Sequence, residues 1–494
     1  MILNFDLNNM DDYQTFLKVK SLPQFRIKGH TAEVPDEYAY LVGEKRATIQ
    51  ASGNYQAPAW MFDYQRAITS VAVRKQKFAV FLECGLGKTA IFLEFARHAA
   101  KQVGRRNVLI VSPLMVIQQT MGEAKRFFGD YPIRQVRANE LQSFLNDGDA
   151  GIGITNFEAI TPDLDRGRLG ALIIDESSML KSHYGKWGTK LIELGRGLDW
   201  KLALTGTPAP NDRIEYANHA VFLDAFPTVN SFLARFFINR GQTSERWELR
   251  PHALEAFYRA LSHWSIFVTN PATYGWKDNA DAIPPIHAHV HDIDLTDEQR
   301  EAVSTETGML FFTGEAGGIM NRSTLGQIAK GKHKGRSFET RKPDYIRGLV
   351  ESWPDESTII WCKFNEEQDS IGELFPGCAN ISGDTPHEKR MELIDAFKSR
   401  QLNVLVSKPK ILGFGLNLQV ATRQVFSTCQ DSYEEYYQAV KRSNRVGSKL
   451  PLSVHLPITE LERPMMENVL RKAAMVQRDT EEQERIFKKY GIGF

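Results

Sequence analysis

Short apolar runs alternate with longer segments of helical pattern along the first half of the chain. Four of these runs are long enough for buried strands and close in polar turns: 108–113, 153–158, 171–177 and 202–208. A further apolar run ends at Val80-Phe81, and residues 90–95 after it have the pattern of a helix. Strands that alternate with helices predict a parallel sheet covered by helices on both faces. Ligands of such a sheet bind at the carboxyl ends of its strands.

The pattern returns in the second half of the chain. Strand signals occur at 357–361 and 403–407, and residues 388–397 between them carry apolar side chains at helical spacing. Residues 212–345, which separate the two halves, are mostly helical in pattern. We therefore predict an α/β fold with two lobes on parallel sheets, joined by helical protrusions.

A glycine-rich turn, Gly-Leu-Gly-Lys-Thr at 85–89, lies between the first strand and its helix. This context is typical of a phosphate-binding loop. Backbone N–H groups from Gly85 through Gly87 to Lys88 can hold phosphates at the helix N-terminus, where the helix dipole favours anions. Lys88 is then expected at the β- and γ-phosphates and Thr89 at the metal, so we expect ATP and Mg²⁺. Because Leu82 stands at the first glycine of the strict GxxxxGK[ST] form, a chance glycine turn is the alternative.

Two acidic residues close the run at 171–177. Asp175 is placed to hold Mg²⁺, and Glu176 to orient and activate the attacking water. Asp-Glu pairs are common on solvated helix caps, but this pair ends a buried strand downstream of a phosphate loop. Thr205 and Thr207 end the next strand, and they either sense the γ-phosphate or cap a local β-turn.

In the second half, Gln438, Arg442 and Arg445 recur at i, i+4 and i+7, which predicts all three on one helical face. Such a basic face is usually solvated. Beside an ATP site we favour a catalytic interpretation, in which the arginines contact the transferring phosphate, because the several N–H donors of a guanidinium suit its charge. Both arginines lie too far beyond Lys88 for one nucleotide-binding domain, so we expect the second lobe to supply them.

In this order the motifs resemble the two RecA-like lobes of a superfamily-two helicase, most closely the Swi/Snf-type DNA translocases. The resemblance runs from about 63 to 457 and rests on these segments: 83–89, 175–178, 204–211, 413–419 and 438–447. It implies that Gln65 reads adenine, that Gly415 of the fifth motif approaches the nucleotide, and that Gln438 is a further nucleotide contact.

Some positions depart from the family pattern. Ser178 replaces the His of the acidic box, Cys84 replaces the Met beside the phosphate loop, and 266–269 stand where an Arg-Arg pair is usual. The compact length and the variants at 408–410 and 436–438 resemble the small phage or prophage branch.

The resemblance implies the following division of the chain. We expect an N-terminal accessory module without catalytic motifs, a first RecA-like lobe that binds ATP, helical protrusions with the linker, a second RecA-like lobe, and a C-terminal helical tail. Their boundaries are 1–55, 56–225, 226–345, 346–475 and 476–494.

Candidate nucleic-acid contacts come from two kinds of segment. One kind is the polar turns after two strands of the first lobe: Ser112, Pro113, Thr155 and Asn156. The other is a basic run that suits phosphates without reading bases: Lys330, Lys332, Lys334 and Arg336. A solvated loop is the alternative for the run.

Three alternating histidines, His287, His289 and His291, project from one face of a strand. Because no carboxylate or cysteine pattern accompanies them, a half-exposed strand is favoured over a metal triad.

Composition is that of a soluble globular protein, with 42% hydrophobic and 24% charged residues and a formal net charge of +1. No apolar run approaches the roughly 20 residues that span a bilayer, so no membrane partner is expected. The four cysteines lack CxxC spacing, and no secretory signal opens the chain, which suits the cytoplasm of a bacterial or phage-infected cell.

We therefore expect an ATP-dependent motor that tracks along DNA, double-stranded or branched, with the DNA assignment resting on the resemblance. One alternative is a strand-separating DNA or RNA helicase on the same core. The other is a nucleotide-switched DNA-binding subunit of a larger complex, which binds ATP with little turnover.

Overall fold

The computed structural model divides into two compact units, residues 1–280 with 479–494 and residues 281–478. It describes residues 1–490 except the following: 7, 23–24, 35–37, 39–41, 44–54, 130, 149–150, 181–185, 210–211, 242–246, 280–282, 308–318, 413–415, 429–432 and 446. Within the described residues, no helix combines the length and apolar character needed to cross a membrane.

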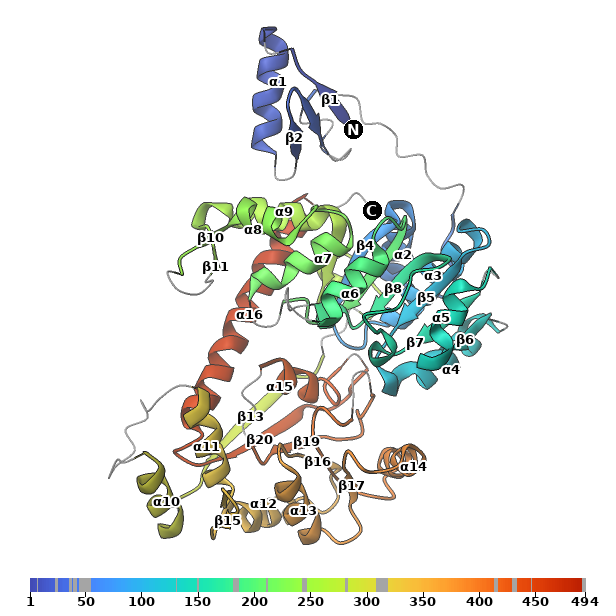
Figure 1. Cartoon of the computed structure of the whole chain (residues 1–494). Helices are drawn as coiled ribbons and strands as arrows, with labels where there is room; N and C mark the ends of the chain where they lie inside the picture. The colour runs from blue at the N-terminus through green and yellow to red at the C-terminus, as the bar shows by residue number, and fades with distance from the viewer. Residues whose placement is uncertain are drawn as a thin grey trace. The chain divides into compact units, whose positions relative to one another are not determined.

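A small module opens unit 1 (Figure 1). Helix α1 (Met10–Ser21) lies beside an antiparallel sheet of β1 (Ile2–Asn4), β2 (Arg26–Lys28) and β3 (Thr31–Glu33), in which β3 is central. Asn9 caps α1 by accepting the N–H of Asp11 at 2.9 Å. The module has its own small core, centred on Val19 and Ala32.

Seven parallel strands form the main sheet of unit 1. They are β4 (Lys77–Leu82), β5 (Asn107–Val111), β6 (Ile133–Gln135), β7 (Ile152–Thr155), β8 (Leu169–Asp175), β9 (Trp200–Thr205) and β12 (Ser265–Val268). Their order is β12-β4-β9-β8-β5-β7-β6, and every pairing is parallel. The predicted parallel sheet of the first lobe is confirmed.

Helices connect and cover these strands (Figure 1). They are α2 (Asp63–Lys75), α3 (Lys88–Gln102), α4 (Ile117–Phe128), α5 (Ala138–Asn146), α6 (Lys186–Gly195), α7 (Tyr216–Phe222), α8 (Val229–Phe236) and α9 (Leu254–Trp264). A two-stranded hairpin of β10 (Phe237–Asn239) and β11 (Trp247–Leu249) follows α8.

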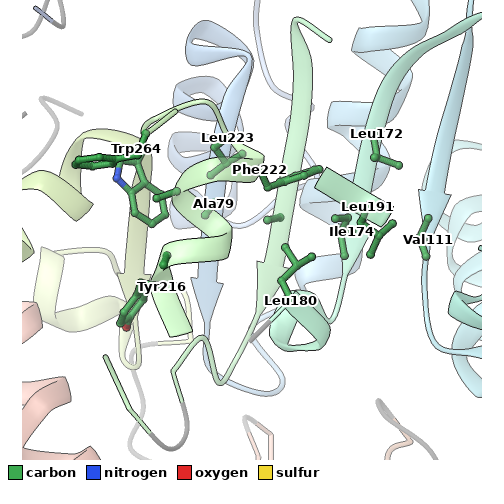
Figure 2. Packing of buried hydrophobic residues seen from close by; sticks show 14 of the residues in the cluster. Ala79, Val111, Leu172, Ile174, Leu180, Leu191, Tyr216, Phe222, Leu223 and Trp264 are labelled. Atoms are coloured by element: carbon green, nitrogen blue, oxygen red, sulfur yellow. The ribbon is translucent and has the colours of Figure 1, made fainter. Parts of the chain in front are cut away.

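The core of unit 1 joins the sheet to residues far apart in sequence. Figure 2 shows Leu191 and Phe222 from α6 and α7 over Leu172 and Ile174 of β8. The last turns of α16 (Arg463–Tyr490) also belong to unit 1, and their residues Ile486 and Phe487 are buried in the same core.

Unit 2 contains a six-stranded parallel sheet. Its strands are β13 (Ile286–Asp292), β16 (Thr358–Trp361), β17 (Ala379–Ile381), β18 (Val404–Ser407), β19 (Arg423–Phe426) and β20 (Leu452–Ile458). Their order is β13-β20-β19-β16-β18-β17. The second parallel sheet is thus confirmed, and the α/β class with it.

Helices and one hairpin complete unit 2. The helices are α10 (Asp297–Thr307), α11 (Ile319–Ala329), α12 (Lys342–Glu351), α13 (Asn365–Leu374), α14 (His387–Lys398), α15 (Tyr433–Val440) and the first turns of α16. The hairpin pairs β14 (Lys332–His333) with β15 (Arg336–Ser337).

Among the described residues, six short strands (β10 to β15) lie inside the segment whose pattern is mostly helical, and two of them extend the parallel sheets. The four residues of β12 pair with β4 at the edge of the first sheet, and β13 pairs with β20 at the edge of the second. Strand β13 carries the alternating histidines, so the strand interpretation of His287, His289 and His291 is confirmed. Among the described residues, no cluster of His, Cys, Asp or Glu could hold a metal ion by itself.

Candidate ATP site

The phosphate loop connects β4 to α3 at the carboxyl end of the sheet. Gly85 and Gly87 have left-handed backbones, with φ of +92° and +72°. A Cβ on Gly87 would lie 2.4 Å from Nε2 of Gln65, so both the conformation and the space require glycine there. The loop therefore presents its backbone N–H groups at the first turn of α3, as an anion site requires.

The side chain of Lys88 folds back over this loop. Its ammonium donates to the carbonyl of Leu82 at 2.9 Å. The turn after β9 lies close by, because a Cβ on Gly206 would approach the Leu82 carbonyl at 3.2 Å and Nζ of Lys88 at 3.6 Å. The loop and the hydroxyl-rich turn thus share one small space around this ammonium.

Gln65 lies in the first turn of α2 and is buried against the phosphate loop. Its Nε2 donates to the carbonyl of Leu86 at 3.1 Å, and its Oε1 accepts the N–H of Phe62 at 3.1 Å. Tyr64 donates to the same Leu86 carbonyl at 2.8 Å. The structure therefore places Gln65 beside the loop, with both ends of its amide bonded to backbone.

Asp175 ends β8 next to the phosphate loop. Its Oδ2 accepts a hydrogen bond from the hydroxyl of Ser112 at 2.8 Å. Burial, followed by the neighbouring carboxylate of Glu176, raises the pKa of Asp175 to about 6, while Ser112 and Lys88 oppose the rise. A cation beside this carboxylate would remove the cost of ionising it.

Glu176 follows in a strained conformation, with a left-handed φ of +62°. Its Oε1 accepts hydrogen bonds from the hydroxyls of Thr205, at 2.6 Å, and Ser178, at 3.2 Å. Non-glycine residues held at positive φ concentrate at functional sites, where surrounding contacts compensate for the strain. The side chain that replaces the family histidine, Ser178, thus helps to position the second acid.

A buried histidine from α7 supports the same turn and was not predicted from the sequence. His219 Nε2 lies 3.0 Å from the hydroxyl of Ser177, and burial lowers the pKa of His219 to about 4. The ring is therefore neutral at physiological pH. His219 lies 42 residues after Ser177, and only the fold brings them together.

The residues present suit Mg²⁺. Thr89 and Asp175 supply a hydroxyl and a carboxylate, which are the hard oxygen ligands that Mg²⁺ prefers, and its remaining positions are usually filled by phosphate oxygens and water. Gly206 carries no side chain toward Nζ of Lys88, to which a Cβ at that position would come within 3.6 Å. The expected metal is therefore compatible with this donor set.

The two arginines lie in unit 2, beyond the end of α15. The prediction that Gln438, Arg442 and Arg445 share one helical face is wrong, because the helix ends at Val440. The buried side chain of Gln424 lies at this end of the helix: its Nε2 donates to the carbonyl of Ala439 at 3.1 Å, and the same carbonyl accepts the N–H of Arg442 at 3.2 Å in a tighter turn.

The side chains of both arginines instead donate to backbone carbonyls in the segment between β18 and β19. Arg442 is buried and donates to the carbonyl of Pro409 at 3.3 Å, with its guanidinium 5.9 Å from the centre of the Trp361 ring. Arg445 donates to the carbonyl of Leu416 at 3.4 Å. Gly415, which the sequence analysis places at the nucleotide, lies outside the described residues. Gln438 donates to Glu434 at 3.3 Å.

Most side chains of the polar turns predicted to contact nucleic acid are buried or hydrogen-bonded to other residues of unit 1. Thr155 is fully buried and donates to the carbonyl of Val136 at 2.8 Å, and Ser112 is committed to Asp175. Pro113 is buried at the start of the following turn, whereas Asn156 is half-buried and bonds Glu158 at 2.7 Å.

The basic run divides into a buried and an exposed part. Lys330 is almost fully buried, 3.7 Å from Glu462, and donates to the carbonyl of Gly326 at 2.6 Å. Lys332, Lys334 and Arg336 are exposed on the β14–β15 hairpin.

Comparison with known proteins agrees with this geometry. A family model described as the SNF2-related domain matches residues 64–340, and one described as the helicase conserved C-terminal domain matches residues 341–447. Their boundary falls just before α12.

Individual relatives are distant. The ATP-dependent helicase fft1 of Schizosaccharomyces pombe is 29% identical over 474 residues, which covers 79% of this chain and 49% of that protein. The SWI/SNF-related matrix-associated actin-dependent regulator of chromatin subfamily A member 1 of Mus musculus is 23% identical over 76% of this chain and 39% of its own length. The chain spans about half or less of the length of these curated relatives.

Among solved structures, the Sulfolobus solfataricus SWI2/SNF2 ATPase core in complex with dsDNA is similar at a TM-score of 0.41 and 20% identity. That similarity covers 90% of this chain and all of the other. The family assignment rests on the matching models and on the motifs. Because the first model alone accounts for more than half of the residues, the chain belongs to the SNF2-related family, in the Swi/Snf branch of helicase superfamily two.

Proposed function

We propose that this protein is an ATP-dependent motor that translocates on double-stranded DNA. The observation that carries the proposal is the conformation of Glu176 near the phosphate loop. Its backbone has a strained positive φ, and two hydroxyls donate hydrogen bonds to its carboxylate. A module that only binds ATP has no use for a positioned second acid. This feature therefore supports turnover.

The residues of unit 1 divide the work of hydrolysis. The loop N–H groups and Lys88 would hold the β- and γ-phosphates, and Thr89 and Asp175 would hold Mg²⁺, which would withdraw charge from the phosphate oxygens. Glu176 accepts a hydrogen bond from a water and aligns it with the γ-phosphorus. Attack breaks the bond between that phosphorus and the bridging oxygen of ADP.

We extend the proposal to the arginines of unit 2. Arg445, with Arg442, would neutralise the charge that develops on the transferring phosphate, where the fork of guanidinium donors is suited to several oxygens at once. Turnover would then require both units, and cycles of ATP binding and hydrolysis would move them along DNA.

DNA enters the proposal through the family. Relatives carry names that describe an ATP-dependent helicase and a regulator of chromatin. We propose double-stranded or branched DNA as the track, in the cytoplasm of a bacterial or phage-infected cell.

One experiment tests this proposal. ATP turnover is measured without nucleic acid and with single-stranded DNA, duplex DNA, forked DNA and RNA. Duplex DNA should stimulate turnover most, and Lys88→Ala or Arg445→Ala should abolish the stimulation while the melting temperature is maintained. Equal stimulation by RNA, or full turnover in either variant, would contradict the proposed roles.

A further inference from the structure

A basic cavity of about 810 Å³ lies within unit 2, under the β14–β15 hairpin. Seven lysine or arginine residues line it, against two glutamates. Its walls come from the hairpin, the first turn of α13, and the ends of β16 and β18, where Lys363 and Lys408 lie. The cavity is therefore strongly cationic, although the net charge of the whole chain is only +1.

The cavity opens at the carboxyl edge of the second sheet. Strand β16 lies between β18 and β19, and Lys363, Lys408 and Ser427 each follow one of these three strands. The chain leaves β16 through α13 and enters β17, which lies on the same side of β16 as β18. Strand β19 lies on the opposite side of β16, so the strand order reverses at β16. Ligands of parallel sheets bind at such a switch point.

A buried ionic group fixes the base of the hairpin. Lys342 donates to both carboxylate oxygens of Glu462, at 2.7 and 3.0 Å, and Lys330 lies 3.7 Å from the same carboxylate. Burial raises the pKa of Glu462, but the two ammonium groups outweigh it, so the pKa lies below its usual value. Gly331 has a left-handed backbone, with φ of +81°, and its carbonyl accepts the N–H of Phe338 at 2.6 Å.

The tip of the hairpin is a two-residue turn with a lysine in an unfavourable conformation. Lys334 and Gly335 have φ of +47° and +77°, the signature of a type I′ turn. Asn, Asp or Gly is the usual first residue of that turn, and a side chain such as lysine costs about 1–2 kcal/mol in the left-handed region. Lys334 occupies this position despite the cost, and its ammonium donates to both carboxylate oxygens of Glu306 at 2.9 Å.

Two of the three exposed cations have carboxylate partners. Lys334, whose side chain is 68% exposed, lies 2.9 Å from Glu306, and Lys332 lies 3.5 Å from Glu366. Arg336 has no carboxylate partner among the described residues of the chain. Exposed pairs of this kind contribute about 0–1 kcal/mol each, so phosphate can replace the glutamates at little cost.

We propose that the β14–β15 hairpin grips the phosphate backbone of the DNA on which the motor moves, with Lys332, Lys334 and Arg336 each neutralising one phosphate at the mouth of the cavity. The inference rests on the proposed function and names a contact surface for it. The contacts are with backbone phosphates, so binding is independent of sequence.

The arrangement of charge favours a polymer over a small polyphosphate. The three cations recur at every second residue of the hairpin and are exposed, and two carboxylates, the exposed Glu366 and the half-buried Glu367, also line the cavity. A compact ligand with several charges would have to enter beside these carboxylates. A DNA backbone carries one charge per phosphate and can remain at the exposed rim.

The first test measures the affinity for duplex DNA as a function of salt. Each lost phosphate contact lowers the salt slope by about 0.9, so Lys332→Ala combined with Arg336→Ala should lower it by about 2 and weaken binding about 30-fold at 0.15 M salt. The matched control is Lys389→Ala on α14, an exposed lysine that pairs with Glu392 and does not line the cavity. The control should bind as the wild type does.

A second variant excludes misfolding as the cause. Lys334→Asn places a residue suited to the left-handed turn at the tip, so the variant should melt no lower than the wild type. It should nevertheless bind DNA about 5-fold more weakly at 0.15 M salt, with a salt slope lower by about 1.

The outcomes separate the two proposals. If the wild type binds no nucleic acid, the proposed function fails. If the wild type binds duplex DNA and the hairpin variants match Lys389→Ala, only the hairpin proposal is overturned. Tripolyphosphate is the competing probe: displacement of DNA by micromolar tripolyphosphate in the wild type, lost in Lys334→Asn, would assign the cavity to a small anion and overturn the proposal.

Discussion

The hydroxyl of Thr205 offers a test of the catalytic arrangement that does not remove a charge. It donates to Oε1 of Glu176 at 2.6 Å, and the hydroxyl of Ser178, which donates to the same oxygen, is more distant at 3.2 Å. Thr205→Val keeps the shape of the buried side chain and deletes this bond. Glu176 should then sample other rotamers, and the attacking water should lose its alignment.

The size of the effect follows from the bond. A hydrogen bond to a charged group contributes about 1.5–3 kcal/mol. If that free energy is lost from the transition state alone, kcat should fall about 10- to 150-fold while KM for ATP changes little. Thr205→Ser, which keeps the hydroxyl, should retain most of the activity.

The assay is steady-state ATP turnover with saturating duplex DNA. The matched control is Thr69→Val, because the Thr69 hydroxyl is fully buried in α2 and has no hydrogen-bond partner among the described residues. This control should leave kcat unchanged. Equal kcat values for Thr205→Val and Thr69→Val would refute the proposed role of the Thr205–Glu176 bond.

Three further predictions concern backbone, pH and buried charge. Gly87→Ala should abolish ATP binding, because the backbone there has a φ of +72° and the new Cβ would lie 2.4 Å from Nε2 of the buried Gln65. The control Gly122→Ala lies exposed in α4 with open space around it and should raise the free energy of unfolding by about 0.5–1 kcal/mol. Burial, then neighbouring histidines, lower the pKa of His455 to about 3. Because the unfolded chain takes up this proton below pH 6.5 and the folded chain only near pH 3, His455 should contribute a loss of up to about 1.4 kcal/mol of stability per pH unit between these two values, and His455→Phe should remove this contribution. Lys342→Met should destabilise unit 2 by about 3–5 kcal/mol, because it leaves the buried carboxylate of Glu462 with the more distant lysine alone.

Each of these has a clear contrary result, read by calorimetry and by binding of a fluorescent ATP analogue. Equal ATP affinity in Gly87→Ala and Gly122→Ala would show that the loop does not approach phosphate. The sign of the His455 effect is fixed, since the unfolded chain binds the extra proton below pH 6.5; stability that rises on acidification would contradict it. A Lys342→Met protein as stable as the wild type would show that the buried ion pair does not anchor unit 2.

The sequence alone predicted the elements that carry strong local signals. The buried strands of both sheets are continuous apolar runs, and the loop at 85–89 has a composition that only a tight turn before a helix explains. The edge strand β12 was not separated from the helical segments around it, because it has only four residues after a helix. The edge strand β13 was predicted from its alternating histidines and not from a continuous apolar run.

The parts of the site that sequence reasoning missed depend on tertiary contacts. The spacing of Arg442 and Arg445 fits a helix, but Gln424 binds the last carbonyls of α15 and the helix stops before them. His219 reaches Ser177 from another helix, and no local pattern marks it. The basic run looks uniform in sequence, yet one of its lysines, Lys330, is buried in an ion pair.

Triplex displacement tests the central claim most directly. A duplex that carries a short third strand is incubated with ATP and either the wild type or Lys88→Ala. The account predicts that the wild type removes the third strand, that the two strands of the duplex stay annealed, and that Lys88→Ala removes nothing. Separation of the duplex strands, or ATP turnover on duplex DNA without loss of the third strand, would contradict translocation along double-stranded DNA.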